Sequence, residues 1–198
     1  MPAAAIEEHD LGLTWVVAEP MRRACHAIAD AGKVWLVDPV DQPEALERAA
    51  ALGEPQAVLQ LLDRHNRDCA AIATRLGVPH LKLPEEVPGS PFEAIQVLGL
   101  PVWRETALWW PQRSALVVAE VLGTNRMYTA GRGAVGVHLF LRALPPGALR
   151  GRDVEHLLVG HGRSLHGPQV SGEIERAYAS SRRDLPHVLV ALPGALRG

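Results

Sequence analysis

Short apolar runs separated by turn residues make up most of this 198-residue chain. Runs such as residues 34–37 and 115–118 are too short for helices and are rich in valine, so each predicts a buried strand. Amphipathic segments follow several of these runs. The segment 43–52, for example, begins with proline and ends before Gly53, which is typical of a helix. This pattern predicts a sheet-centred α/β domain covered by helices.

The same reasoning assigns the other elements along the chain. The segment after Cys25 reads either as helical turns or as the first strand of a hairpin. We prefer the hairpin because Asp30, Ala31, Gly32 and Lys33 make a good turn. Strands are predicted over residues 13–17, 34–37, 57–62, 80–83, 95–98, 102–103, 107–110, 115–118 and 154–159. Helices are predicted over 43–52, 68–76 and 168–183, with loops over 84–91 and 122–136.

Composition excludes several classes of protein. The apolar fraction of 47% and charged fraction of 21% are typical of a folded globular chain. A net charge of −2 gives no long-range field for nucleic acid or an anionic membrane surface, and no apolar run reaches the roughly 18 residues of a membrane span. The acidic start, with Glu7, Glu8 and Asp10, does not resemble a signal peptide. Nearly all basic residues are arginines, as in proteins from high-GC genomes, so we expect a cytoplasmic bacterial protein.

Polar clusters follow two of the predicted strands. The first is the stretch from Asp63 to Cys69, which is read either as a solvated loop in which Asp68 caps the next helix, or as a site at the carboxyl edge of a sheet. The second is His161 between Gly160 and Gly162, which is read as a tight turn or as a ligand-binding position. Both alternatives stay open on the residues alone.

The order of these segments resembles the metallo-β-lactamase-fold superfamily. In that family a strand ends in aspartate, a T-H-x-H-x-D-H motif precedes a helix, and a strand ending in G-D and another ending in a glycine-flanked histidine follow later. Here the matching segments are 35–39 (WLVDP), 63–69 (DRHNRDC), 116–122 (LVVAEVL) and 159–162 (VGHG). The resemblance is strongest over residues 13–165. It implies one domain over residues 1–198, a four-layer αββα sandwich, with a C-terminal helical extension over 166–198.

Departures from the motifs bear on function. Aligning on Asp68 puts Arg64 and Asn66 where the family's first two histidines stand, and the segment 101–105 contains no third histidine, so the resemblance implies that one metal site is lost. For the second site the alignment leaves Asp68, Cys69 and His161, all competent zinc ligands, with Glu120 in place of the bridging aspartate. His65 falls on a spacer position of the motif.

Two hypotheses of different class follow from the resemblance. We favour a member without the usual metal centre that binds a small, anionic ligand through Arg64, His65, Asn66 and Arg67, or that acts through assembly. The alternative is a hydrolase with one zinc, iron or manganese ion on Asp68, Cys69 and His161, which attacks an ester, amide or phosphoester with Asp68, Glu120 and Asp38 in catalysis. In the second case Cys69→Ala would remove metal and activity together. Enzymatic activity and homo-oligomerisation are left open, and no nucleic-acid or membrane partner is expected.

A glycine-rich segment, 131–136 (GRGAVG), matches the pattern of a dinucleotide-binding loop. The pattern is meaningful only between a buried strand and a long helix, because the phosphates bind at the helix N-terminus. Neither element is predicted around this segment, so we interpret it as a flexible loop near the pocket.

Overall fold

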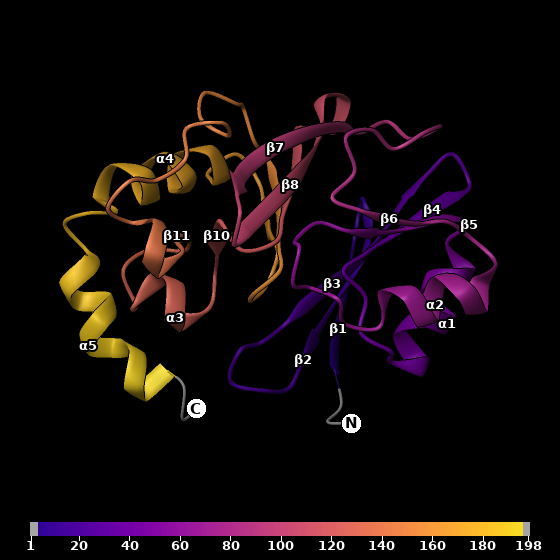
Figure 1. The fold of residues 1–198 in the computed structure, drawn as a ribbon, viewed down its shortest axis with the longest axis horizontal. Helices are drawn as coiled ribbons and strands as arrows, with labels where there is room; N and C mark the ends of the chain where they lie inside the picture. Colours follow the sequence, from indigo (N-terminus) through magenta and orange to yellow (C-terminus); the bar gives the residue numbers. More distant parts are fainter. Residues whose placement is uncertain (1–3, 196–198) are drawn as a thin grey trace.

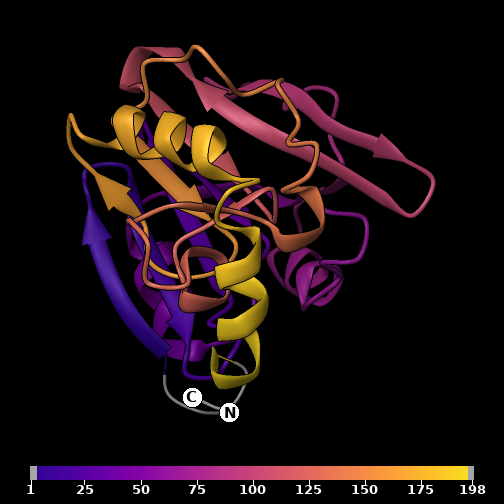
Figure 2. The same cartoon turned by 90° about the vertical axis from the view of Figure 1, so that its left-hand side faces the viewer.

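Two β-sheets face each other across the main hydrophobic core, and helices cover their outer faces (Figure 1). The computed structural model describes residues 4–195. A view turned by 90° faces the side on which the C-terminal helix lies, so that this helix stands in front (Figure 2). The arrangement is the predicted four-layer α/β sandwich.

The first sheet has six strands in the order of the sequence. Its first four strands are antiparallel neighbours, whereas β4, β5 and β6 run parallel. The strands are β1 (Ala4–His9), β2 (Gly12–Val17), β3 (Ala24–Asp30), β4 (Lys33–Val37), β5 (Glu54–Gln60) and β6 (His80–Lys82).

Alternation along β4 explains how this sheet joins two cores. Trp35 and Val37 point into the core between the sheets, while Val34 and Leu36 point to the opposite face. That opposite face is covered by α1 (Pro43–Ala51) and α2 (Cys69–Leu76). Helix α2 ends at Gly77, whose φ of +68° favours glycine.

The second sheet has five strands in the order β13-β12-β9-β8-β7. β12 runs parallel to the central strand, β9, and the remaining neighbours are antiparallel. The strands are β7 (Glu93–Leu100), β8 (Trp103–Trp110), β9 (Ala115–Val118), β12 (His156–Val159) and β13 (Leu165–His166). A two-stranded antiparallel sheet of β10 (Leu122–Gly123) and β11 (Gly136–Val137) and the helices α3 (Arg126–Thr129), α4 (Val170–Ser180) and α5 (Leu185–Ala195) also belong to the fold.

Most predicted elements are confirmed, including the hairpin of β3 and β4. Three predictions were wrong. The stretch 102–110 is one strand instead of two, the predicted loop 122–136 contains the short elements β10, α3 and β11, and the predicted helix 168–183 is the shorter α4, followed by the separate helix α5. Strand β1 was not predicted. Among the described residues, no helix is both long and apolar enough to cross a bilayer.

A buried polar network joins the two sheets along one seam. His26 on β3 contacts the Val159 carbonyl through Nε2 at 3.1 Å, so Nε2 carries the proton. The Nδ1 atom of His26 lies 2.9 Å from the Thr14 hydroxyl, which also lies 3.0 Å from the hydroxyl of Ser164. Every member is fully or nearly fully buried, so the network fixes the relative position of the sheets.

Candidate metal centre

Four polar side chains follow parallel strands and meet at one edge of the sandwich. Asp38 comes directly after β4, and His65 lies in the loop after β5, its parallel neighbour. In the second sheet Glu120 follows β9, and His161 follows β12, again a parallel neighbour. Since the carboxyl ends of neighbouring parallel strands lie at the same edge of a sheet, this topology places the four side chains close together.

Three of them form a compact group of potential ligands. One ligand atom each of His65, Glu120 and His161 lies within 4.8 Å of the other two. The Oε1 atom of Glu120 is 3.4 Å from His65 Nε2 and 3.7 Å from His161 Nε2. Two imidazole nitrogens and a carboxylate oxygen are a donor set that zinc and ferrous iron both accept.

Each histidine is oriented by a partner on its other ring nitrogen. His65 Nδ1 lies 3.0 Å from Oδ2 of the buried Asp38, and His161 Nδ1 lies 3.0 Å from the Met21 carbonyl oxygen. A carbonyl only accepts, so His161 Nδ1 donates to Met21 and Nε2 is the ring nitrogen that faces the centre. That Nε2 is buried and has no hydrogen-bond partner. Such an orphaned nitrogen, aimed at a carboxylate, fits a metal ion.

Opposing effects set the charges of the group. Burial opposes the charged form of His65, but the carboxylates of Asp38 and Glu120 outweigh burial and raise the pKa of His65. Burial likewise opposes ionisation of Glu120, yet His161, His65 and Arg64 hold the pKa of Glu120 well below its usual value. Without a metal, His65 and Glu120 are therefore held as an ion pair.

Arg64 lies at the open side of the group. Its Nη2 donates to Oε2 of Glu120 at 2.6 Å, and the guanidinium stands 4.3 Å above the ring of Trp103. The side chain is still 42% exposed. A guanidinium held over an aromatic ring and open to solvent can bind a carboxylate or phosphate in two-point contact.

Arg67 turns inward and ties three chain segments together. Its Nη1 donates to the backbone carbonyls of Ala24 at 2.6 Å and Asp38 at 2.7 Å, and its Nη2 donates to Gly160 at 3.2 Å. Ala24 belongs to β3, Asp38 follows β4, and Gly160 directly precedes His161. The Arg67 guanidinium thus places a fixed positive charge close to the histidines of the group.

Glu105 on β8 supports the loop that carries Glu120. Its carboxylate accepts backbone N–H bonds from Ala119, Glu120 and Val121, at 2.9 to 3.1 Å. Burial raises the pKa of Glu105 to about 7, although these hydrogen bonds act in the opposite direction and lower it. The sequence signal for this residue is an acidic side chain within a segment rich in tryptophan, and none of the matched motifs includes it.

The structure places the predicted ligands differently from the motif alignment. Asp68 accepts a 2.8 Å hydrogen bond from the backbone of Asp41, and its side chain does not cap α2. Cys69 is fully buried in the core between the first sheet and its helices, where burial raises the thiol pKa to about 12. Within the described residues, neither joins His161 in a group of three ligands.

The remaining predicted ligand-binding residues divide between the site and its surroundings. His65, given a spacer position by the alignment, points into the group instead. Asn66 points away, because its Oδ1 lies 3.3 Å from Gln60 Nε2 and 3.4 Å from Lys82 Nζ. Tyr128 was not predicted as a site residue. Its ring stacks on the ring of His161, with 6.0 Å between the two ring centroids.

Comparisons with solved structures decide the fold. DIM-1 metallo-β-lactamase aligns over 92% of this chain and 98% of its own, with a TM-score of 0.58 and 11% identity. ETHE1 from Myxococcus xanthus aligns over 96% of this chain and 91% of its own, with a TM-score of 0.55 and 13% identity. The chain has the metallo-β-lactamase fold.

A third structure of this fold, TTHA1623 in a di-iron-bound form, aligns over 89% of this chain and 98% of its own, with a TM-score of 0.50 and 17% identity. No family model and no curated protein matches the sequence. The similarity is therefore one of backbone arrangement, and the metallo-β-lactamase fold by itself does not define what the centre of this chain binds.

Proposed function

We propose that the chain is a hydrolase with one metal ion, held by His65, Glu120 and His161, that acts on a small ester, amide or phosphoester with an anionic group. The observation that carries the proposal is the orphaned Nε2 of His161, buried and aimed at a carboxylate that also faces His65. Three protein ligands are the usual number for a catalytic zinc, which keeps a further position open. The proposed ligand set replaces the one expected from the motif alignment.

The chain's own residues have distinct roles in this proposal. Asp38 holds the proton at Nδ1 of His65, which leaves Nε2 free to bind. The Met21 carbonyl does the same for His161. A bound divalent ion supplies Lewis acidity and lowers the pKa of a coordinated water. Arg64, above Trp103, binds the anionic group of the substrate.

Arg67 explains why we propose one ion instead of two. Its guanidinium lies against the carbonyls of Asp38 and Gly160, next to both loops that flank the centre. A second cation beside this partly buried positive charge would be repelled, with less screening than in water. The fixed charge of Arg67 therefore disfavours a dinuclear centre.

A metal-free binding protein is the second candidate. The 2.6 Å ion pair of Arg64 with Glu120 favours it, because the carboxylate already has a cationic partner. In this case His65 stays protonated between Asp38 and Glu120, and Arg64 binds an anionic ligand without turning it over.

Metal content separates the two candidates. Untagged protein, purified without chelators and then incubated with zinc, iron(II) or manganese, is expected to hold about one ion per chain. His65→Ala and His161→Ala should lose the ion, whereas the exposed His80→Ala should keep it. Loaded protein is then screened against carboxylic esters and phosphodiesters. No retained metal under any condition would refute the hydrolase and leave the binding protein.

A further inference from the structure

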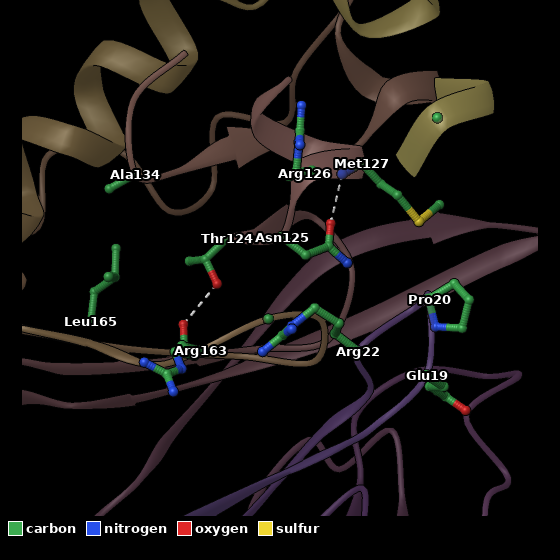
Figure 3. A pocket seen from close by; sticks show the side chains of 12 residues that line it. Glu19, Pro20, Arg22, Thr124, Asn125, Arg126, Met127, Ala134, Arg163 and Leu165 are labelled. Carbon is green, nitrogen blue, oxygen red and sulfur yellow. Dashed lines mark hydrogen bonds between the residues drawn. The ribbon is translucent and has the colours of Figure 1, made fainter. Parts of the chain in front are cut away.

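A cavity of about 600 Å³ lies behind the loop that carries His161. Figure 3 shows it between the β2–β3 loop, the start of α3 and the segment after His161. None of His65, Glu120 and His161 lines it. Its volume falls within the range of small-molecule sites.

Three arginines line this cavity, namely Arg22, Arg126 and Arg163. In Figure 3, Arg22 and Arg163 lie on one side of the segment Thr124–Asn125 and Arg126 on the other. All three are exposed, and within residues 4–195 their side chains have no acidic partner. Three unpaired guanidiniums around one cavity repel one another, so an anion bound there is stabilised.

The acidic residue in the lining does not compensate this charge. Glu19 is held by Arg23, which donates from Nε at 2.5 Å and from Nη2 at 2.8 Å. The hydrogen bond from Arg23 keeps the pKa of Glu19 below its usual value, so the carboxylate stays ionised within that pair. The cavity therefore keeps the net positive charge of its three arginines.

Backbone contacts fix the two walls that carry Arg22 and Arg163. The N–H of Gly162 donates to the Arg22 carbonyl at 2.9 Å, and the Thr124 hydroxyl donates to the Arg163 carbonyl at 2.7 Å. Gly162 has a φ of +114°, and a Cβ there would lie 2.1 Å from Thr124 Oγ1. Only glycine permits this close approach, so the walls are held together without any ligand.

We propose that this cavity binds a small, multiply charged anion, either a phosphate ester or a polycarboxylate, through Arg22 and Arg163, with Arg126 contributing from the opposite side. The site is separate from the metal centre and does not depend on the ion. It is connected to the centre through Met21, whose carbonyl receives both the Asn125 amide at 2.9 Å and His161 Nδ1 at 3.0 Å.

Calorimetric titration of the full chain at low salt tests this proposal with inorganic pyrophosphate and with citrate as probes. Saturable binding of at least one probe is expected, and the preferred probe identifies the anion class. Arg22→Gln and Arg163→Gln should each weaken binding about tenfold or more, because each variant loses charge-assisted hydrogen bonds to the anion. These side chains have no hydrogen bonds within the described residues, so the variants are expected to fold normally.

Two controls decide where the anion binds. Arg48→Gln removes the same charge from an exposed position on α1, outside the cavity lining, and should leave the affinity within about twofold. His65→Ala should also leave it unchanged, because the centre is not involved. No saturable binding of either probe, an equal loss in Arg48→Gln, or a loss in His65→Ala with none in Arg163→Gln would each overturn the proposal.

Discussion

Asp38 and His65 form a buried hydrogen bond of 3.0 Å although 27 positions separate them in the sequence. They meet because each follows one of two parallel neighbouring strands, β4 and β5. The contact fixes the ring of His65 and leaves its Nε2 facing Glu120 at 3.4 Å. Removing the charge from Asp38 should therefore weaken any ion bound at the centre, without removing a ligand.

Asp38→Asn is expected to lower metal affinity by roughly ten- to one-hundred-fold, as for other partners of metal-binding histidines. Competition against a coloured chelator measures the change. Asp41→Asn is the matched control, because Asp41 is an exposed carboxylate paired with Arg75. Equal affinities of Asp38→Asn and the unmodified protein would show that His65 does not bind the ion.

Cys69→Ala should leave the metal content unchanged. The thiol lies in the core beside Ile72 and Ala73 instead of at the centre, so its removal leaves a small cavity and costs about 1 kcal/mol of unfolding free energy. Metal analysis and urea denaturation of the same preparation measure both quantities. A loss of metal with unchanged stability would restore the ligand set expected from the motif alignment.

Arg67→Met should destabilise the fold by about 3 kcal/mol or more, because three backbone carbonyls lose their donor. Arg67→Lys should recover part of this, since an ammonium keeps the charge but not the planar geometry. Urea denaturation measures both. Arg75→Met, at an exposed ion pair, should change the free energy by less than about 1 kcal/mol. Similar losses of unfolding free energy in Arg67→Met and Arg75→Met would contradict the role of Arg67 as the donor to these three carbonyls.

Acid should weaken the seam between the sheets through His26. Burial lowers the pKa of His26 to about 3 from an ordinary value of 6.5, so the folded state binds its proton less readily than the unfolded state. The stability from neutral His26 is complete above about pH 6.5 and is lost as the pH falls towards 3, by up to about 1.4 kcal/mol per pH unit.

Urea denaturation at pH 7.5, 6 and 5 measures this loss. His9 and His138, whose pKa values burial lowers to about 4, act in the same direction. The comparison is therefore between the unmodified protein and His26→Gln, which should show a shallower decline below pH 6.5. Parallel curves for the two proteins would exclude His26 as a source of acid sensitivity.

The sequence predicted the sandwich and, among its candidate site residues, Asp38, His65, Glu120 and His161. The ligand set taken from the motif alignment differs from the group that the structure brings together, and the reason lies in the backbone. The motif alignment gave His65 a spacer position because it counted residues along a regular loop. In the structure Arg67 has a φ of +40° and Asp38 a φ of +44°. Residues other than glycine seldom adopt a positive φ. The residue types therefore do not indicate the backbone turns around the centre, beside which His65 lies.

Strand β8 shows the same limit for secondary structure. The polar residues Arg104, Glu105 and Thr106 interrupt its apolar pattern, so the sequence predicts two strands. Glu105 is nevertheless buried, because the backbone amides of residues 119–121 satisfy its carboxylate. Only a partner distant in sequence makes this strand continuous, and local patterns contain no information about that partner.

The three carbonyls bound by Arg67 also constrain how the chain folds. Ala24, Asp38 and Gly160 lie in both halves of the molecule, so this side chain cannot satisfy all of them until the second sheet has docked on the first. Such contacts between distant segments form slowly, since the entropy of closing the intervening loops is lost before they form. The Arg67 contacts that hold Asp38 and Gly160 beside the centre are therefore completed only when both sheets are in place.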